Sequence, residues 1–169
     1  MNPNGNDRAT AGAPREKSMH SHSEDSHRMP LRVMNGTGCR ECGAVYESGR
    51  WIWSATARVT RQLLCPACRR ILEHAPAGEL WLDSCGYLHK HLAQIISFLS
   101  NEAQHEKECH PMERITGINV EPRGVRVTTS GPHMLRRLGS AMLRAHHGEL
   151  SIEYRDGEAV ARANWTHQG

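Results

Sequence analysis

The chain has 169 residues, with 21 lysines and arginines against 18 aspartates and glutamates and a formal net charge of +3. This length accommodates one ordinary domain or two small ones, and so small a net charge does not by itself indicate nucleic-acid binding. No apolar run approaches the roughly 18 residues of a membrane span, and the first residues lack the apolar stretch of a secretory signal. Composition therefore predicts a cytoplasmic protein without membrane contacts.

The first segment, residues 1–30, is rich in polar, charged, Gly and Pro residues and has no apolar periodicity. A segment of this composition cannot bury enough apolar surface to fold, so we expect a disordered tail. The histidines between Met19 and His27 could bind a metal loosely, but a solvated tail is the preferred interpretation.

Residues 31–82 carry two Cys-x-x-Cys pairs, Cys39 with Cys42 and Cys65 with Cys68, separated by roughly twenty residues, as in two-knuckle zinc sites. Each pair places two sulfurs on one side of a tight loop, and two facing loops supply the four thiolates that zinc (Zn2+) binds at about 2.3 Å. This spacing predicts a zinc-ribbon module of short strands around one closed, structural zinc site.

Other chemistries of cysteine fit this pattern less well. A thioredoxin-like redox pair needs one Cys-x-x-Cys in a βαβ context, a catalytic zinc needs an open coordination position, and iron–sulfur ligation is chemically possible but suits the spacing less. Arg40, Arg69 and Arg70 neighbour the ligands and would help to keep thiolates ionised. Cys85 and Cys109 each lie one helical turn from a histidine but lack knuckle spacing, so no second metal site is expected.

Residues 83–169 switch repeatedly between helical and strand-like apolar spacing. The pattern predicts a helix over about 84–106 and a hairpin over 116–129. A second helix is expected over 132–147 and a second hairpin over 150–165. The predicted fold class is therefore α+β, with a zinc ribbon followed by a helix–hairpin–helix–hairpin module whose helices cover one face of an antiparallel sheet.

The stretch 122–147 contains no aspartate or glutamate, and its arginines could form one cationic surface that neutralises phosphates. These candidate nucleic-acid-binding residues are Arg123, Arg126, Arg136, Arg137 and Arg144. The predicted ribbon adds a second basic group, interleaved with Trp51 and Trp53, whose indoles could stack on unpaired bases. Large aromatic side chains are more often buried, however, and the ribbon arginines could equally form an ordinary solvated face. This second group comprises Arg50, Arg58, Arg61, Arg69 and Arg70.

A family resemblance rests on the two cysteine knuckles followed by Pro76-Ala-Gly78, the helix, and the hairpin from Ile115-Thr-Gly-Ile118 to Val127-Thr-Thr129 with its arginine-rich helix. Over about residues 34–165 the chain resembles the Nmd3-like zinc-ribbon family of large-ribosomal-subunit export adaptors, and especially its small uncharacterised bacterial relatives. The resemblance implies binding to ribosomal RNA or a ribosomal subunit, and a metal role for the four knuckle cysteines only. Further cysteine pairs of the family are missing here.

The leading hypothesis is a non-enzymatic zinc-binding factor that associates with RNA or a ribosomal subunit, with arginines on phosphates. The alternative is a zinc-stabilised protein–protein interaction adaptor that presents a groove or a sheet edge to a partner protein. An enzyme is not expected, because no recognisable nucleophile, acid–base or phosphate-loop arrangement occurs.

Overall fold

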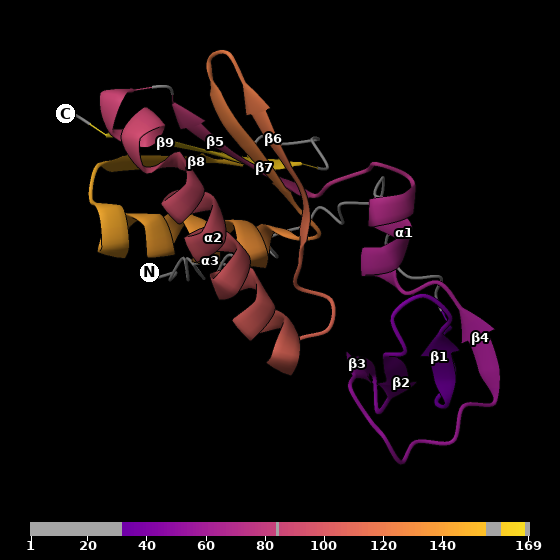
Figure 1. Ribbon diagram of the computed structural model, residues 1–169. Helices are drawn as coiled ribbons and strands as arrows, with labels where there is room; N and C mark the ends of the chain where they lie inside the picture. The colour runs from indigo at the N-terminus through magenta and orange to yellow at the C-terminus, as the bar shows by residue number, and fades with distance from the viewer. Residues whose placement is uncertain (1–31, 84, 155–159, 168–169) are drawn as a thin grey trace, which may run out of the picture.

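The computed structural model describes residues 32–83, 85–154 and 160–167, which form two modules (Figure 1). The predicted tail lies outside these ranges. The N-terminal module contains β1 (Thr37–Cys39), β2 (Val45–Glu47), β3 (Arg50–Ile52), β4 (Arg61–Leu63) and α1 (Pro66–Leu72). The sheet module contains β5 (Gly78–Asp83), α2 (Gly86–Cys109), β6 (Ile115–Glu121), β7 (Gly124–Thr129), α3 (Pro132–His146), β8 (Glu149–Glu153) and β9 (Ala161–Thr166).

The N-terminal module is a four-stranded sheet in the order β3-β2-β1-β4, in which only β1 and β4 pair in parallel. Each strand has three residues, and the small core consists of Ala44, Trp51, Ala67 and three of the cysteines. A core of this size supplies little stability by itself. The module therefore depends on an additional constraint, which the cysteines are placed to provide.

The sheet module is a five-stranded sheet in the order β6-β7-β5-β9-β8. The central strand β5 pairs antiparallel with β7 and parallel with β9, while the outer pairs are hairpins. The predicted α+β class is confirmed, but the prediction of an antiparallel sheet is wrong: the sheet is mixed, because β5 joins the two hairpins and runs parallel to β9. The module boundary predicted at residues 82 and 83 falls at the end of β5, although by its pairing this strand belongs to the sheet module.

Helices α2 and α3 lie on one side of the five-stranded sheet (Figure 1), and their apolar faces share one core with the inner residues of the strands. On β5 and β7 the alternate residues Leu80, Leu82, Val125 and Val127 point toward the helices and are buried, as the two-residue period of a strand requires. Within the described ranges, no helix is both long and apolar enough to cross a membrane.

The starts of both long helices use caps that the sequence pattern did not predict. Helix α2 is capped by the Cys85 sulfur, which accepts a hydrogen bond from the Leu88 amide at 3.4 Å. Helix α3 has no cap from its own preceding residue. Instead, the Glu113 carboxylate accepts a hydrogen bond from the Met134 amide at 2.9 Å, which satisfies an otherwise free donor of the first turn.

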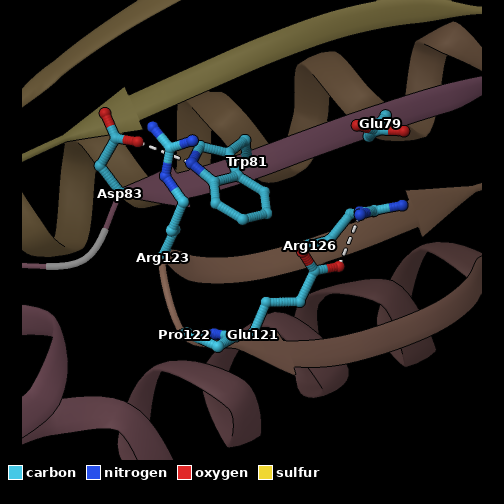
Figure 2. A pocket seen from close by; sticks show the side chains of 7 residues that line it. All are labelled: Glu79, Trp81, Asp83, Glu121, Pro122, Arg123 and Arg126. Atoms are coloured by element: carbon cyan, nitrogen blue, oxygen red, sulfur yellow. Dashed lines mark hydrogen bonds and ion pairs between the residues drawn. The ribbon is translucent and has the colours of Figure 1, made fainter.

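The opposite face of the sheet is polar and open. On β5 it presents Glu79, Trp81 and Asp83, which alternate with the buried residues of the same strand. Arg126 of β7 pairs across from Trp81 and lies on this face too, as Figure 2 shows. The sheet therefore has one face covered by helices and one face available for contacts.

Gly124 begins β7 at a position that requires glycine. Its φ of +149° lies in a region that other residues avoid, and a Cβ there would collide with the Leu82 carbonyl oxygen. We expect Gly124→Ala to lower the free energy of unfolding by about 1–3 kcal/mol, measured by urea denaturation. The control is Gly86→Ala at the start of α2, where a Cβ meets no atom within 4 Å; equal stability of the two variants would contradict the strain.

Candidate metal centre

The four knuckle cysteines converge on one point, as the spacing predicted. Cys39 ends β1, Cys42 follows in the turn, Cys65 caps α1 and Cys68 lies in the first turn of that helix. All four sulfurs lie within 4.8 Å of one another, and those of Cys42 and Cys65 are 3.8 Å apart. A tetrahedral site with sulfur at about 2.3 Å from the metal has edges of about 3.8 Å. The donor set therefore fits a four-coordinate metal ion such as zinc.

Backbone amides help to fix the sulfurs in place. The Cys65 amide donates to the Cys39 sulfur at 3.3 Å, and the Cys68 amide donates to the Cys65 sulfur at 3.4 Å. Gly43 completes the first knuckle with a φ of +77°, a conformation that costs glycine little. In the described part of the chain, no other group of histidine, cysteine and acidic side chains has metal-ligand spacing.

Crowding and burial prevent the four thiols from all ionising without a cation. The hydrogen bond with Cys42, followed by burial, raises the pKa of Cys65, and burial raises the pKa of Cys68 to about 11. The same hydrogen bond lowers the pKa of Cys42 to about 4, against the effect of its burial. A metal ion would supply the positive charge that four adjacent thiolates need.

Arg114, in the loop between α2 and β6, reaches this centre from the sheet module. Its Nη1 donates to the Cys68 sulfur at 3.3 Å and its Nη2 to the Cys42 sulfur at 3.1 Å, while Nε donates to the Pro111 carbonyl at 2.7 Å. The side chain is buried, which opposes its charge, but its contacts with the cysteines raise the pKa of Arg114. It therefore places a positive charge on the tetrathiolate and joins the two modules.

Two of the arginines next to the cysteines in sequence lie in other surroundings. Arg40 is exposed, and Arg70 donates instead to the Ala75 carbonyl at 3.0 Å. Arg114 carries no motif and is distant in sequence from the ligands, so only the tertiary structure reveals it.

The two tryptophans of the N-terminal module differ in burial, since Trp51 is 6% exposed and Trp53 is 37% exposed. Trp51 is buried and packs edge-on against Tyr46, with ring centroids 5.6 Å apart. Trp53 donates from Nε1 to the Lys107 carbonyl at 2.7 Å, and its ring lies 5.8 Å from the Arg114 guanidinium carbon. Trp53 therefore strengthens the contact between the modules, and Trp51 has the core position that large aromatics usually take.

The five candidate arginines of the acid-free stretch are divided between different surroundings. Arg126 lies on the open sheet face and forms an ion pair with Glu121 at 2.6 Å, whereas α3 and its arginines lie on the covered side. The five side chains therefore do not form one continuous surface. The three members that are exposed, and without an ion-pair partner among the described residues, are Arg123, Arg136 and Arg144.

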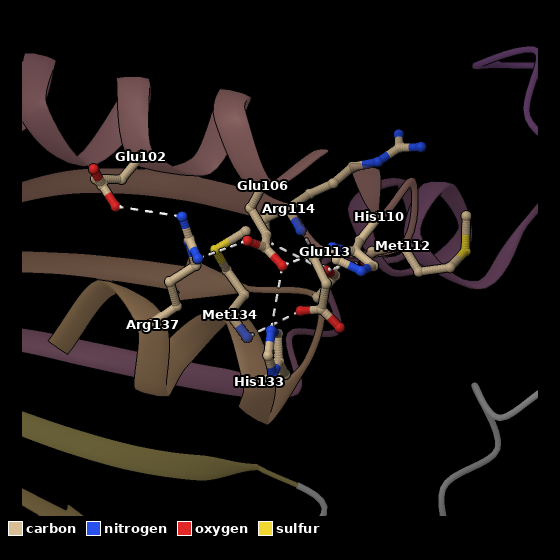
Figure 3. A network of polar contacts seen from close by, with 10 residues as sticks. Glu102, Glu106, His110, Met112, Glu113, Arg114, His133, Met134 and Arg137 are labelled. Atoms are coloured by element: carbon tan, nitrogen blue, oxygen red, sulfur yellow. Dashed lines mark hydrogen bonds and ion pairs between the residues drawn. The ribbon is translucent and has the colours of Figure 1, made fainter. Parts of the chain in front are cut away.

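Arg137 belongs to a polar network between α2 and α3 (Figure 3). Its Nη1 lies 2.9 Å from a Glu106 carboxylate oxygen, and the other oxygen of Glu106 contacts His110 at 2.8 Å and His133 at 3.3 Å. Although burial alone would raise it, the pKa of Glu106 is lowered by the hydrogen bond with His133 and the charge of Arg137. Arg137 of α3 is therefore paired with α2 and links the two helices.

Arginines of the N-terminal module remain free at the end of the sheet remote from the cysteines. Arg61 pairs with Thr37, the first residue of β1, whereas Cys39 is the last. Arg50 follows the turn between β2 and β3, and the Arg58 carbonyl lies beside Gly36. Among the described residues, none of these exposed guanidinium groups has an ion-pair partner. We call Arg50, Arg58 and Arg61 the arginine end.

Comparison with known proteins gives no relative: no family model matches the chain, and no curated protein or solved structure is similar enough to count as a match. The resemblance to the Nmd3-like family therefore stays a prediction.

Removal of the metal tests the tetrathiolate. We expect one zinc ion per chain, and we expect a strong chelator or Cys65→Ser to unfold the N-terminal module, because structural zinc contributes about 10–16 kcal/mol of apparent binding free energy in comparable peptides. Elemental analysis and circular dichroism measure both effects. Cys109→Ser, at an exposed cysteine, is the control; full zinc content and folding in the Cys65 variant would exclude the site.

Replacement of Arg114 tests the link between the modules. Arg114→Ala leaves the tetrathiolate without its cationic donor and should cost about 1.5–3 kcal/mol of stability, the range for hydrogen bonds to charged groups. Arg114→Lys keeps the positive charge but cannot donate to both sulfurs in the planar geometry of a guanidinium group. We therefore expect its stability to lie between those of Arg114→Ala and the unchanged chain. Chemical denaturation measures both, with Arg40→Ala as the exposed control. Equal stability of Arg114→Ala and Arg40→Ala would show that the contact contributes nothing.

Proposed function

We propose that the chain is a non-enzymatic, zinc-stabilised RNA-binding factor of the cytoplasm, whose N-terminal module contacts the phosphate backbone. The observation that carries this proposal is the arginine end, where three exposed guanidinium groups lack an acidic partner among the described residues. Arginines not held by carboxylates are available for bidentate contacts with phosphate oxygens.

The wider charge of the N-terminal module supports the same partner. Arginines outnumber glutamates in residues 32–77, and this segment contains no aspartate. Arg123, Arg136 and Arg144 remain candidates for further phosphate contacts from the sheet module. The whole chain thus has a small net charge, but its N-terminal module is locally basic. A polyanion responds to the local charge of the surface that it contacts.

The metal is assigned a structural role. Four cysteine ligands close the coordination sphere of zinc, so no position is left for a substrate or an activated water. Zinc in this role would hold the short strands together and keep the arginine end at a fixed place relative to the sheet module.

The family resemblance leads us to propose ribosomal RNA, within a ribosomal subunit, as the RNA. Its support is the residue pattern of the knuckles, hairpin and arginine-rich helix. The basic N-terminal module is compatible with that partner, because RNA in a subunit presents a dense surface of phosphates.

Charge reversal tests where RNA binds. Arg50→Glu with Arg58→Glu and Arg61→Glu should weaken binding of the zinc-loaded chain to single-stranded RNA at least tenfold and flatten its salt dependence, because each phosphate contact releases counterions. Fluorescence anisotropy at several salt concentrations measures this. The matched control is Arg136→Glu with Arg144→Glu on α3. A larger effect of the control would move the site to the sheet module, and absence of binding by the unchanged chain at low salt would refute the proposal.

A protein-interaction adaptor is the second candidate. The observation that favours it is one of the two outer edges of the five-stranded sheet, the edge formed by β6, where Val120 is 61% exposed. An edge strand of this kind can pair with an extended segment of another protein. A partner protein captured equally well by the unchanged chain and by the charge-reversed arginine end would favour the adaptor.

A further inference from the structure

The indole of Trp81 forms a flat platform on the open face of the five-stranded sheet. Its Nε1 donates to the Asp83 carboxylate at 2.6 Å, which fixes the direction of the ring along β5. Its Cζ2 lies 3.1 Å from the position that a Cβ of Gly124 would take, so the ring covers the neighbouring strand where no side chain intervenes. Trp81 is partly exposed. One face of the indole therefore rests on the sheet and the other faces outward.

The outward face of Trp81 looks into an open pocket of about 760 Å³. Figure 2 shows the indole with charged side chains of both signs around it. The lining residues are Glu79, Trp81, Asp83, Glu121, Pro122, Arg123 and Arg126.

The carboxylates of the pocket can accept further hydrogen bonds. Glu79 and Asp83 lie two residues before and after Trp81 on the same face, about 7 Å away along the strand. Asp83 accepts hydrogen bonds from two neutral donors, the Trp81 indole and the Asn164 amide at 3.3 Å, so its charge is not neutralised by them. Glu79 has no hydrogen-bond or ion-pair partner among the described residues. A planar ligand on the indole would thus meet a carboxylate at its edge.

The guanidinium groups of the pocket also keep free donors. Arg126 uses Nη2 for Glu121, and its side chain is 41% exposed. Arg123, at the tip of the β6–β7 hairpin, is exposed, and no ion pair involves it among the described residues. These donors suit an anionic group, so the pocket offers an aromatic face, hydrogen-bond acceptors and cationic donors together.

We propose that this pocket binds an unpaired guanine nucleotide of single-stranded RNA, with the base stacked on Trp81. Glu79 accepts hydrogen bonds from the adjacent N1–H and N2–H donors of guanine, and Arg123 and Arg126 contact its phosphate. The inference rests on the proposed RNA-binding function and gives it a base preference. Unpaired bases are recognised in this manner, by stacking on an aromatic ring and by hydrogen bonds at their edges.

Simpler ligands would use only part of the pocket. An ammonium group could lie over the indole beside the carboxylates, but Arg123 and Arg126 would then repel it. A free phosphate would satisfy the arginines and be repelled by Glu79 and Asp83. Guanine presents two adjacent donors that match both oxygens of one carboxylate, whereas adenine offers a single exocyclic amino group at its Watson–Crick edge. A guanine nucleotide therefore accounts for both signs of charge.

The test compares oligouridine hexamers that carry one central guanine or one central adenine, bound to the zinc-loaded full chain at low salt. We expect the guanine hexamer to bind at least fivefold more tightly. Trp81→Ala should weaken its binding about tenfold, since stacking of one base is worth about 1–3 kcal/mol, whereas Trp81→Phe should retain most of the affinity. Glu79→Gln should reduce the preference for guanine while both hexamers still bind.

Zinc content and thermal denaturation of each variant show whether it is folded, and the Trp81→Phe variant keeps the test valid if Trp81→Ala is unstable. If the unchanged chain binds both hexamers equally, or if neither Trp81 variant nor Glu79→Gln changes binding, the pocket is not a guanine site although RNA binding stands. If no hexamer and no longer RNA binds at low salt, the proposed function fails together with the inference.

Discussion

The hydrogen bonds from one buried guanidinium group to two cysteine sulfurs join the two modules of this molecule. A buried arginine is unfavourable unless anions accept its hydrogen bonds, and four clustered thiolates are unfavourable unless positive charge balances them. Arg114 and the tetrathiolate meet both needs at once, at 3.1 and 3.3 Å. Because the ligands belong to one module and Arg114 to the other, the charge balance of the metal centre also determines how the modules are held together.

The fold decides which charges the surface offers to a partner. Sequence alone treats all arginines of a basic stretch alike, but Arg126 is paired with Glu121 and Arg137 with Glu106. Those acidic partners come from β6 and α2, outside or at the edge of the stretch, and reach it only through the tertiary structure. Among the described residues, the exposed arginines without an ion-pair partner include the arginine end of the N-terminal module and, in the sheet module, Arg123, Arg136 and Arg144.

Residue spacing and alternation in the sequence predicted the features that depend on interactions between residues close in sequence. The four cysteines followed from their spacing, and the alternation over 116–129 matches β6 and β7. The place of β5 was not predictable, because its apolar residues Leu80 and Leu82 are explained only by partners distant in sequence, β7 and β9. Arg114 was missed for the same reason: its contacts span 46 and 72 residues, and no motif marks it. The platform of Trp81 depends on Gly124 across the sheet, which a strand pattern does not reveal.

The parallel pairing of β5 with β9 has a consequence for how the chain folds. All strand pairings and candidate ligands described for the N-terminal module lie between Thr37 and Cys68, so its four cysteines can come together as soon as that segment leaves the ribosome. The centre of the five-stranded sheet must wait for β9, and contacts of such long range form slowly. During this interval β5 has an unpaired edge next to an already folded neighbour. If the N-terminal module binds its metal early, less of the nascent chain remains unfolded while β5 waits to pair with β9.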